Sequence, residues 1–159
     1  MSAFVKGGGV TTPYGRNEFL RSTKEGQIQT ESYTVAASTV PARTIDGAPN
    51  QKILQPGTVL AKITSGVDIG KVGPYQAVVN GATPLPTDGR QTAANIVGLN
   101  LTYLPWLLIE RDVEIAAVYD CVAVQGWCKE LDALGLEVVL TNTTADAMRG
   151  TKGLDVKFK

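Results

Sequence analysis

The feature that most constrains this sequence is the stretch 57–98, in which short apolar runs are each closed by glycine or proline. Residues 57–64 have the composition of an apolar strand, and the Asp88-Gly89 turn signal precedes a run of small apolar residues that includes Ala93 and Ala94. Glycine accepts positive φ at no steric cost, so dipeptides such as Asp-Gly favour turns. Small side chains let backbones approach closely. We therefore expect a strand at 57–64 and place the small-residue run in the core beneath the strands.

Strand patterns continue on both sides of this stretch. Residues 113–119 are apolar on both faces, which predicts a central strand that continues or bends into 122–124. A clean alternation of apolar and charged residues near the C-terminus predicts an amphipathic strand. The expected strands are 27–40, 57–64, 75–79, 113–124, 136–140 and 154–159.

Helical signals are few and short. Trp127, Leu131 and Leu134 recur at helical spacing before the stop signal Gly135, which predicts a short helix. Residues 143–148 predict a second, one-turn helix, and Asp46-Gly47 marks a turn-rich loop. With 17 glycines and 8 prolines among 159 residues, the chain favours many turns and few long helices. The fold class expected is mainly β, an α+β domain with one or two short helices.

The N-terminal region lacks both helical and strand periodicity. Residues 1–26 are polar and Gly-rich, and their apolar side chains occur singly or in pairs. We interpret this region as an extended arm in front of a β-rich domain at 27–159. The apolar positions available to anchor the arm on a partner are Phe4, Val5, Tyr14, Phe19 and Leu20.

The composition argues against several function classes. Fifteen basic residues balance 15 acidic ones, so the chain has no basic surplus for direct nucleic-acid binding. It has no histidine, the commonest general base and metal ligand. Carboxylates such as Glu110 and Asp112 flank a strand, where acidic side chains are usually solvated. We therefore predict no catalytic residues, no metal site and no cofactor.

Two cysteines, Cys121 and Cys128, are too few for a disulfide framework or a four-thiolate zinc site. They either pair with each other or remain as two reduced thiols, and the second reading is favoured. The N-terminus has no apolar run of signal-peptide length, and no stretch approaches the length of a membrane span. We expect a soluble protein made in the cytoplasm of its host, with no membrane partner.

The order of several weak motifs resembles the head decoration proteins of lambda-like tailed bacteriophages. The motifs are the strand 57–66, the segment 71–75 that reads Lys-Val-Gly-Pro-Tyr, and Asp88-Gly89 followed by 91–97 and a hydrophobic strand. The resemblance covers about residues 57–140, with a weaker echo at 45–47. The polar arm also fits that family, whereas the segment after Leu140 does not match it.

The resemblance implies a small β-clip-like domain that trimerises and sits at the three-fold positions of an expanded capsid. There it would cement the shell against internal DNA pressure, with the major capsid protein and its own copies as partners, on the outer surface of the virion. An apolar excess marks either a core segment or the trimer interface, at Leu104, Pro105, Trp106 and Leu107. The alternatives are another self-assembling phage module, such as a tail or baseplate part, and a small ligand-binding β-domain.

Overall fold

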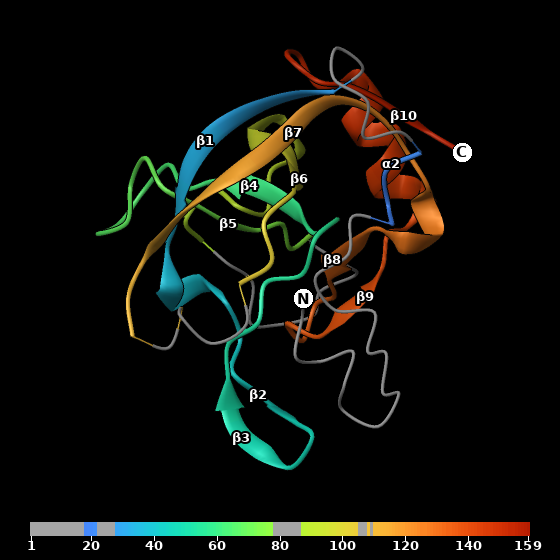
Figure 1. Ribbon diagram of the computed structural model, residues 1–159. Helices are drawn as coiled ribbons and strands as arrows, with labels where there is room; N and C mark the ends of the chain where they lie inside the picture. Colours follow the sequence, from blue (N-terminus) through green and yellow to red (C-terminus); the bar gives the residue numbers. More distant parts are fainter. Residues whose placement is uncertain (1–17, 22–27, 78–86, 105–107, 109) are drawn as a thin grey trace.

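The computed structural model describes residues 18–21, 28–77, 87–104, 108 and 110–159, and it is mainly β (Figure 1). The described residues form the strands β1 to β10, the helix α2 and short 3-10 turns. The expected fold class, mainly β with a short helix, is confirmed.

The main sheet closes on itself. The strand order of the main sheet is β1-β5-β4-β6-β7-β10. Because β1 also pairs with β7, the strands β1, β5, β4, β6 and β7 form a closed ring. The closing contact between β1 and β5 is parallel and brief, pairing Val35 with Val72, and the backbone N–H of Ala36 donates to the carbonyl of Val72 at 2.9 Å. The strands are β1 (Gln29–Val35), β4 (Val59–Lys62), β5 (Val72–Pro74), β6 (Ile96–Asn100), β7 (Val113–Ala123) and β10 (Asp155–Phe158).

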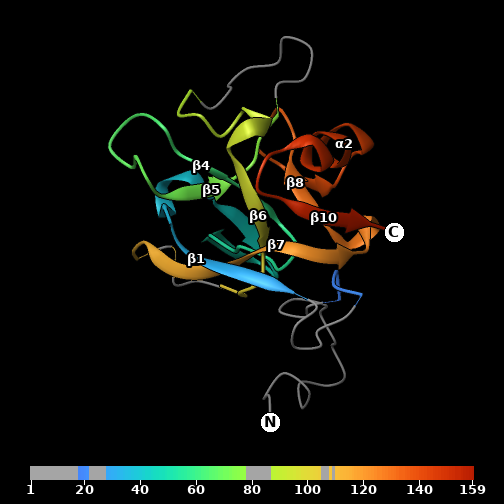
Figure 2. The same ribbon diagram turned by 90° about the horizontal axis from the view of Figure 1, so that it is seen from above.

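β7 is the strand on which the sheet depends. It pairs with β1 and β6, both antiparallel, and with β10, which is parallel. Asp120 pairs with Gln29 of β1 and with Asp155 of β10, so these two strands lie on opposite edges of β7 (Figure 2). The predicted central strand at 113–119 is confirmed, and it continues to Ala123 without a break.

Two hairpins extend from the ring. In the first, β2 (Arg43–Ile45) and β3 (Ala48–Gln51) project from the body of the molecule (Figure 1). Their turn has positive φ at both Asp46 and Gly47, as the tight turn of a two-residue hairpin requires. The second hairpin is β8 (Lys129–Leu131) and β9 (Glu137–Val139).

The second hairpin overturns the helix predicted from Trp127, Leu131 and Leu134. The chain instead makes a 3-10 turn at Gln125–Trp127 and then enters β8. Trp127 and Leu134 are exposed and only Leu131 is buried, so the helical spacing does not mark a buried face. The strand predicted at 136–140 is confirmed as β9.

Helix α2 (Asn142–Gly150) confirms the helix predicted at 143–148 and is longer than one turn. Its N-cap is Thr141, whose hydroxyl accepts from the backbone N–H of Thr144 at 3.3 Å. Ala145 and Met148 are fully buried against β10, where they join Val156 in the core.

The core has two apolar clusters, and one of them includes residues expected in the arm. Phe19 is 1% exposed, and Leu20 forms a bridge with Ala123 at the end of β7. Both side chains are part of the folded domain, although the arm was expected to extend to about Gly26. Their burial leaves them little surface for contact with a partner. The rest of the expected arm, 1–17 and 22–26, lies outside the described residues.

Two other expectations differ in detail. Of the strand predicted at 75–79, residues 75–77 follow β5, with Tyr75 and Gln76 buried, and 78–79 lie outside the described residues. In the small-residue run, Ala93 is half-buried and Ala94 exposed, within a 3-10 turn. Burial in this run begins with Ile96 of β6, because only from there does the chain join the sheet.

Candidate docking surface

The residues expected at a trimer interface are only partly described. Leu104 is 4% exposed and packs in the core, where it bridges Leu54. It therefore has little surface left for a contact between subunits. Pro105, Trp106 and Leu107 lie outside the described residues, as do Phe4, Val5 and Tyr14 of the predicted arm.

Exposed apolar side chains gather instead at the β8–β9 hairpin. Leu134 is 69% exposed, Leu136 59% and Val139 50%, and Trp127 lies just before the hairpin with 52% of its surface exposed. Large apolar side chains exposed together mark candidate interaction sites. Trp127 and Leu134 belong to the apolar repeat that predicted a short helix, and Leu136 and Val139 belong to the strand predicted at 136–140.

The hairpin extends the wall of the ring through β8. The backbone N–H of Lys129 donates to the carbonyl of Gly57 at 2.9 Å, and that of Leu131 donates to the carbonyl of Tyr75 at 3.1 Å. Parallel bridges of β8 with Thr58 and Gln76 accompany these bonds. One edge of β8 therefore joins the ring, and its other edge pairs with β9.

The outer edge of β9 has no partner strand among the described residues. Hydrogen bonds from Asp132 to Leu136 at 2.8 Å and from Leu140 to Cys128 at 3.0 Å flank the antiparallel ladder. Residues of such a ladder alternate between facing the partner strand and facing away from it. By this alternation the backbone N–H and C=O groups of Glu137 and Val139 face away from β8. No hydrogen bond to these groups occurs within the part of the chain that the structure describes.

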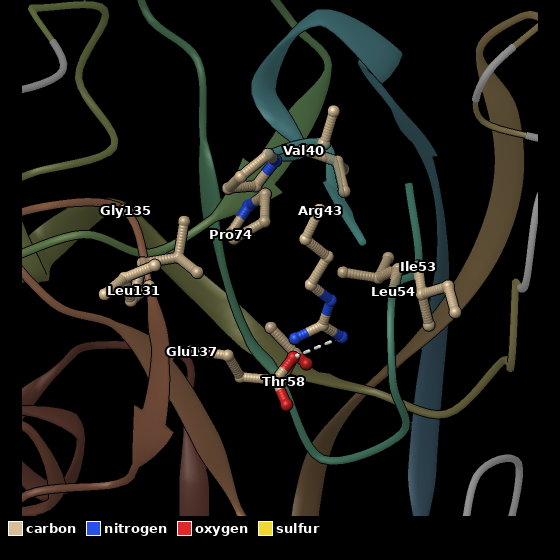
Figure 3. A pocket seen from close by; sticks show the side chains of 12 residues that line it. Val40, Arg43, Ile53, Leu54, Thr58, Pro74, Leu131, Gly135 and Glu137 are labelled. Carbon is tan, nitrogen blue, oxygen red and sulfur yellow. Dashed lines mark hydrogen bonds and ion pairs between the residues drawn. The ribbon is translucent and has the colours of Figure 1, made fainter. Parts of the chain in front are cut away.

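A cavity of about 210 Å³ lies beside β9 (Figure 3). Residues from β2, from the loop after β3, from β5 and from the β8–β9 hairpin line it, and most of the lining is apolar. Arg43 and Glu137 approach each other across it, with Nη2 and Oε2 3.3 Å apart (Figure 3). The aliphatic lining includes Val40, Pro41, Ile53, Leu54, Pro74, Leu131 and Leu136.

Thr58 contributes a polar group to this cavity. Its side chain is 2% exposed, and its Oγ1 atom has no hydrogen-bond partner within the described parts of the chain. A buried hydroxyl without a partner costs free energy, roughly 1–3 kcal/mol. The cavity therefore combines apolar walls with one ion pair, and the hydroxyl of Thr58 is enclosed within its lining.

A buried carboxylate supports the hairpin from inside. Glu130 of β8 is 4% exposed, and burial raises the pKa of its carboxyl above the usual value. Hydrogen bonds from Thr144 and Thr141 act in the opposite direction on this pKa. Through these contacts Glu130 ties β8 to the N-terminus of α2, which fixes the hairpin to the core.

A second exposed apolar group lies on the β4–β5 loop, where Val67 and Ile69 are exposed. Lys71 anchors the loop, because its Nζ atom lies 2.7 Å from Asp68 and 2.6 Å from Asp112. The hydrogen bond to Asp112 is the main reason that the pKa of Lys71 is raised. Hydrogen bonds from Lys71 lower the pKa of Asp68 and of Asp112.

The remaining reactive groups are enclosed. Cys121 and Cys128 are free thiols, both buried, and burial raises the pKa of each to about 12. Among the described residues, no three side chains of His, Cys, Asp or Glu are grouped so that they could hold a metal ion. No helix in the described ranges is both long and apolar enough to cross a membrane.

Comparison with known proteins gives no relative: no family model, no curated protein and no solved structure matches this chain.

Proposed function

We propose that this chain is a head decoration protein of a tailed bacteriophage. In this proposal it binds the major capsid protein on the outside of the expanded shell, as a homotrimer at three-fold positions. Its work is mechanical, because it ties neighbouring shell subunits together against the pressure of packaged DNA. It needs no catalytic group and no cofactor for this role.

The observation that carries the proposal is the placement of the segments on which the resemblance rests. They fold as β4, β5 and β6, three adjacent strands of the ring. Polar contacts join them, since the N–H of Thr64 donates to the carbonyl of Asp88 at 2.7 Å and Nη1 of Arg90 donates to the carbonyl of Pro74 at 3.1 Å. Motifs that are dispersed in the sequence therefore make one unit in space, which supports a shared fold rather than a chance order of turn signals.

The β8–β9 hairpin gives the proposal a contact surface. Its exposed leucine and valine side chains offer apolar area, and the adjacent cavity offers a pocket. Apolar anchors that are buried in pockets supply much of the binding energy of protein interfaces. A trimer presents three such surfaces, so individually weak contacts add through a high effective concentration.

Incubation with expanded, undecorated heads of the phage that encodes the chain, followed by sedimentation, tests the proposal. We expect the protein to sediment with expanded heads and to stay in solution with the unexpanded precursor or without heads. Binding to purified tails but not to heads would favour a tail or baseplate role. Failure to bind any particle would refute a virion function.

Two further measurements test the trimer and the cementing role. Sedimentation equilibrium, or the symmetry of a reconstructed particle, should give three copies at each site, whereas single copies on the particle would contradict the trimer. Decorated heads should release their DNA at a higher temperature than bare heads. Equal release temperatures would leave a decoration protein that binds without cementing.

A further inference from the structure

We infer that the open edge of β9 takes an extended strand of a shell subunit, which inserts one apolar side chain into the cavity beside Glu137. This inference rests on the proposed function and names the way in which the surface binds. It is carried by two features of the hairpin: the backbone groups of β9 that are unpaired among the described residues, and the cavity that Glu137 of β9 helps to line.

The backbone geometry defines where a strand would pair. The N–H and C=O groups of Glu137 and Val139 face away from β8 and are unpaired among the described residues. An exposed strand edge of this kind pairs readily with an added strand, because main-chain hydrogen bonds need no particular sequence. Two outward-facing residues allow up to four such bonds.

The side chains define which strand would fit. On an added strand, the residue opposite Glu137 carries its side chain on the same face of the sheet as Glu137, which is the face of the cavity. A cavity of about 150 Å³ is enough to bind benzene. At about 210 Å³ this cavity has room for an aromatic or branched aliphatic side chain. The apolar side chains of Leu136 and Val139 flank the edge and would pack against the residues that follow.

The lining of the cavity refines the choice. Its walls are mostly apolar, and the hydroxyl of Thr58 is enclosed, so an apolar side chain fits the space. The occupant is therefore an extended segment with an aromatic or branched aliphatic residue opposite Glu137.

The first test removes one outward-facing N–H group. Val139→Pro deletes the donor at the edge, and proline is tolerated on edge strands where its nitrogen faces solvent. We expect co-sedimentation with expanded heads to weaken at least about tenfold, because each copy of the trimer loses a hydrogen bond. Thr44→Lys is the control and should bind as the unchanged chain does, since it changes an exposed residue of β2 outside the cavity lining. Equal binding by Val139→Pro and the unchanged chain overturns the inference.

The second test fills the cavity and does not depend on the proline variant folding. Ala42→Trp places a large side chain at the cavity lining, whereas Ala48→Trp makes the same change on β3, outside the lining. We expect the first variant to bind heads at least about tenfold more weakly, since its ring occupies the space of an anchor residue. The second should bind as the unchanged chain does, and equal binding by both variants would contradict the use of the cavity.

Amide hydrogen exchange shows whether the edge of β9 becomes covered on the shell. In the free protein the amide of Val138, which faces β8, should be protected, and those of Glu137 and Val139 should exchange quickly. On expanded heads all three should be protected. Protection of Glu137 and Val139 already in the free protein would assign the edge to another segment of this chain and overturn the inference. Head binding without new protection would also overturn it while leaving the proposed function intact, whereas a chain that binds no heads refutes both.

Discussion

Replacing Gly98 by alanine tests the closed sheet directly. Gly98 lies in β6, between β4 and β7, and has a φ of +146°, a conformation that side chains rarely adopt. A Cβ atom at this position would lie 2.3 Å from the carbonyl oxygen of Val118 in β7. Separations under 3.0 Å are essentially never observed for a real Cβ, so the two strands would have to move apart.

The size of the effect follows from two costs. Holding a residue other than glycine in this region of φ costs about 1–3 kcal/mol. Moving β6 away from β7 weakens the ladder around the pairs Leu99–Val118 and Asn100–Ala117, at about 1 kcal/mol for each hydrogen bond lost. We expect Gly98→Ala to lower the free energy of unfolding by about 3–5 kcal/mol. For a domain of this length that lowers Tm by roughly 6–20 °C.

Urea unfolding followed by circular dichroism measures the change, with Gly126→Ala as the matched control. Gly126 has no positive φ, and a Cβ there would meet nothing within 4 Å. Its replacement should change the free energy of unfolding by less than about 0.5 kcal/mol, as surface substitutions usually do. A Gly98→Ala variant within about 1 kcal/mol of the unchanged chain would refute the close approach of β6 and β7.

Three further predictions concern ionisable groups. Burial raises the pKa of Glu130 in the folded state, so the free energy of unfolding falls as pH rises from near 4.5. Glu130→Gln lacks this titration, and its free energy of unfolding should rise relative to that of the unchanged chain between about pH 4 and 7. A difference between the two chains that stays constant with pH in urea unfolding would contradict this. Cys121 and Cys128, each with a pKa of about 12, should react with a thiol reagent at pH 8 only on unfolding, and rapid labelling of the native protein would show the core to be open. Lys71→Met should speed amide exchange in the β4–β5 loop, whereas Lys62→Met, which removes a lysine outside the Lys71 ion pairs, should not; equal exchange would show that the ion pairs do not hold the loop.

The candidate docking surface could not be predicted from the sequence. Trp127, Leu131 and Leu134 were interpreted as the apolar positions of a short helix, but the chain buries Leu131 in a strand and leaves the other two exposed. The open edge of β9 depends on β8 joining the ring at Gly57 and Tyr75, residues more than 50 positions away in the chain. A local pattern shows which side chains are apolar and not which of them a distant strand covers.

Local chemistry was enough for several elements. The alternation at 113–119, the composition of 57–64, the amphipathic C-terminal strand and the short helix at 143–148 each predicted an element that the structure contains. These predictions succeeded because periodicity and turn residues act through neighbouring positions along the chain.

The sequence alone thus determined a mainly β domain, the strands β1, β4, β7, β9 and β10, and the turn at Asp46-Gly47. Tertiary structure alone decided the closure of the ring by β1, the burial of Phe19 and Leu20 beside the end of β7, and the exposure of the β8–β9 hairpin. The physical reason is that strand pairing and burial are contacts between distant segments. Their free energy depends on which surfaces meet, and the local pattern of residues does not contain that information.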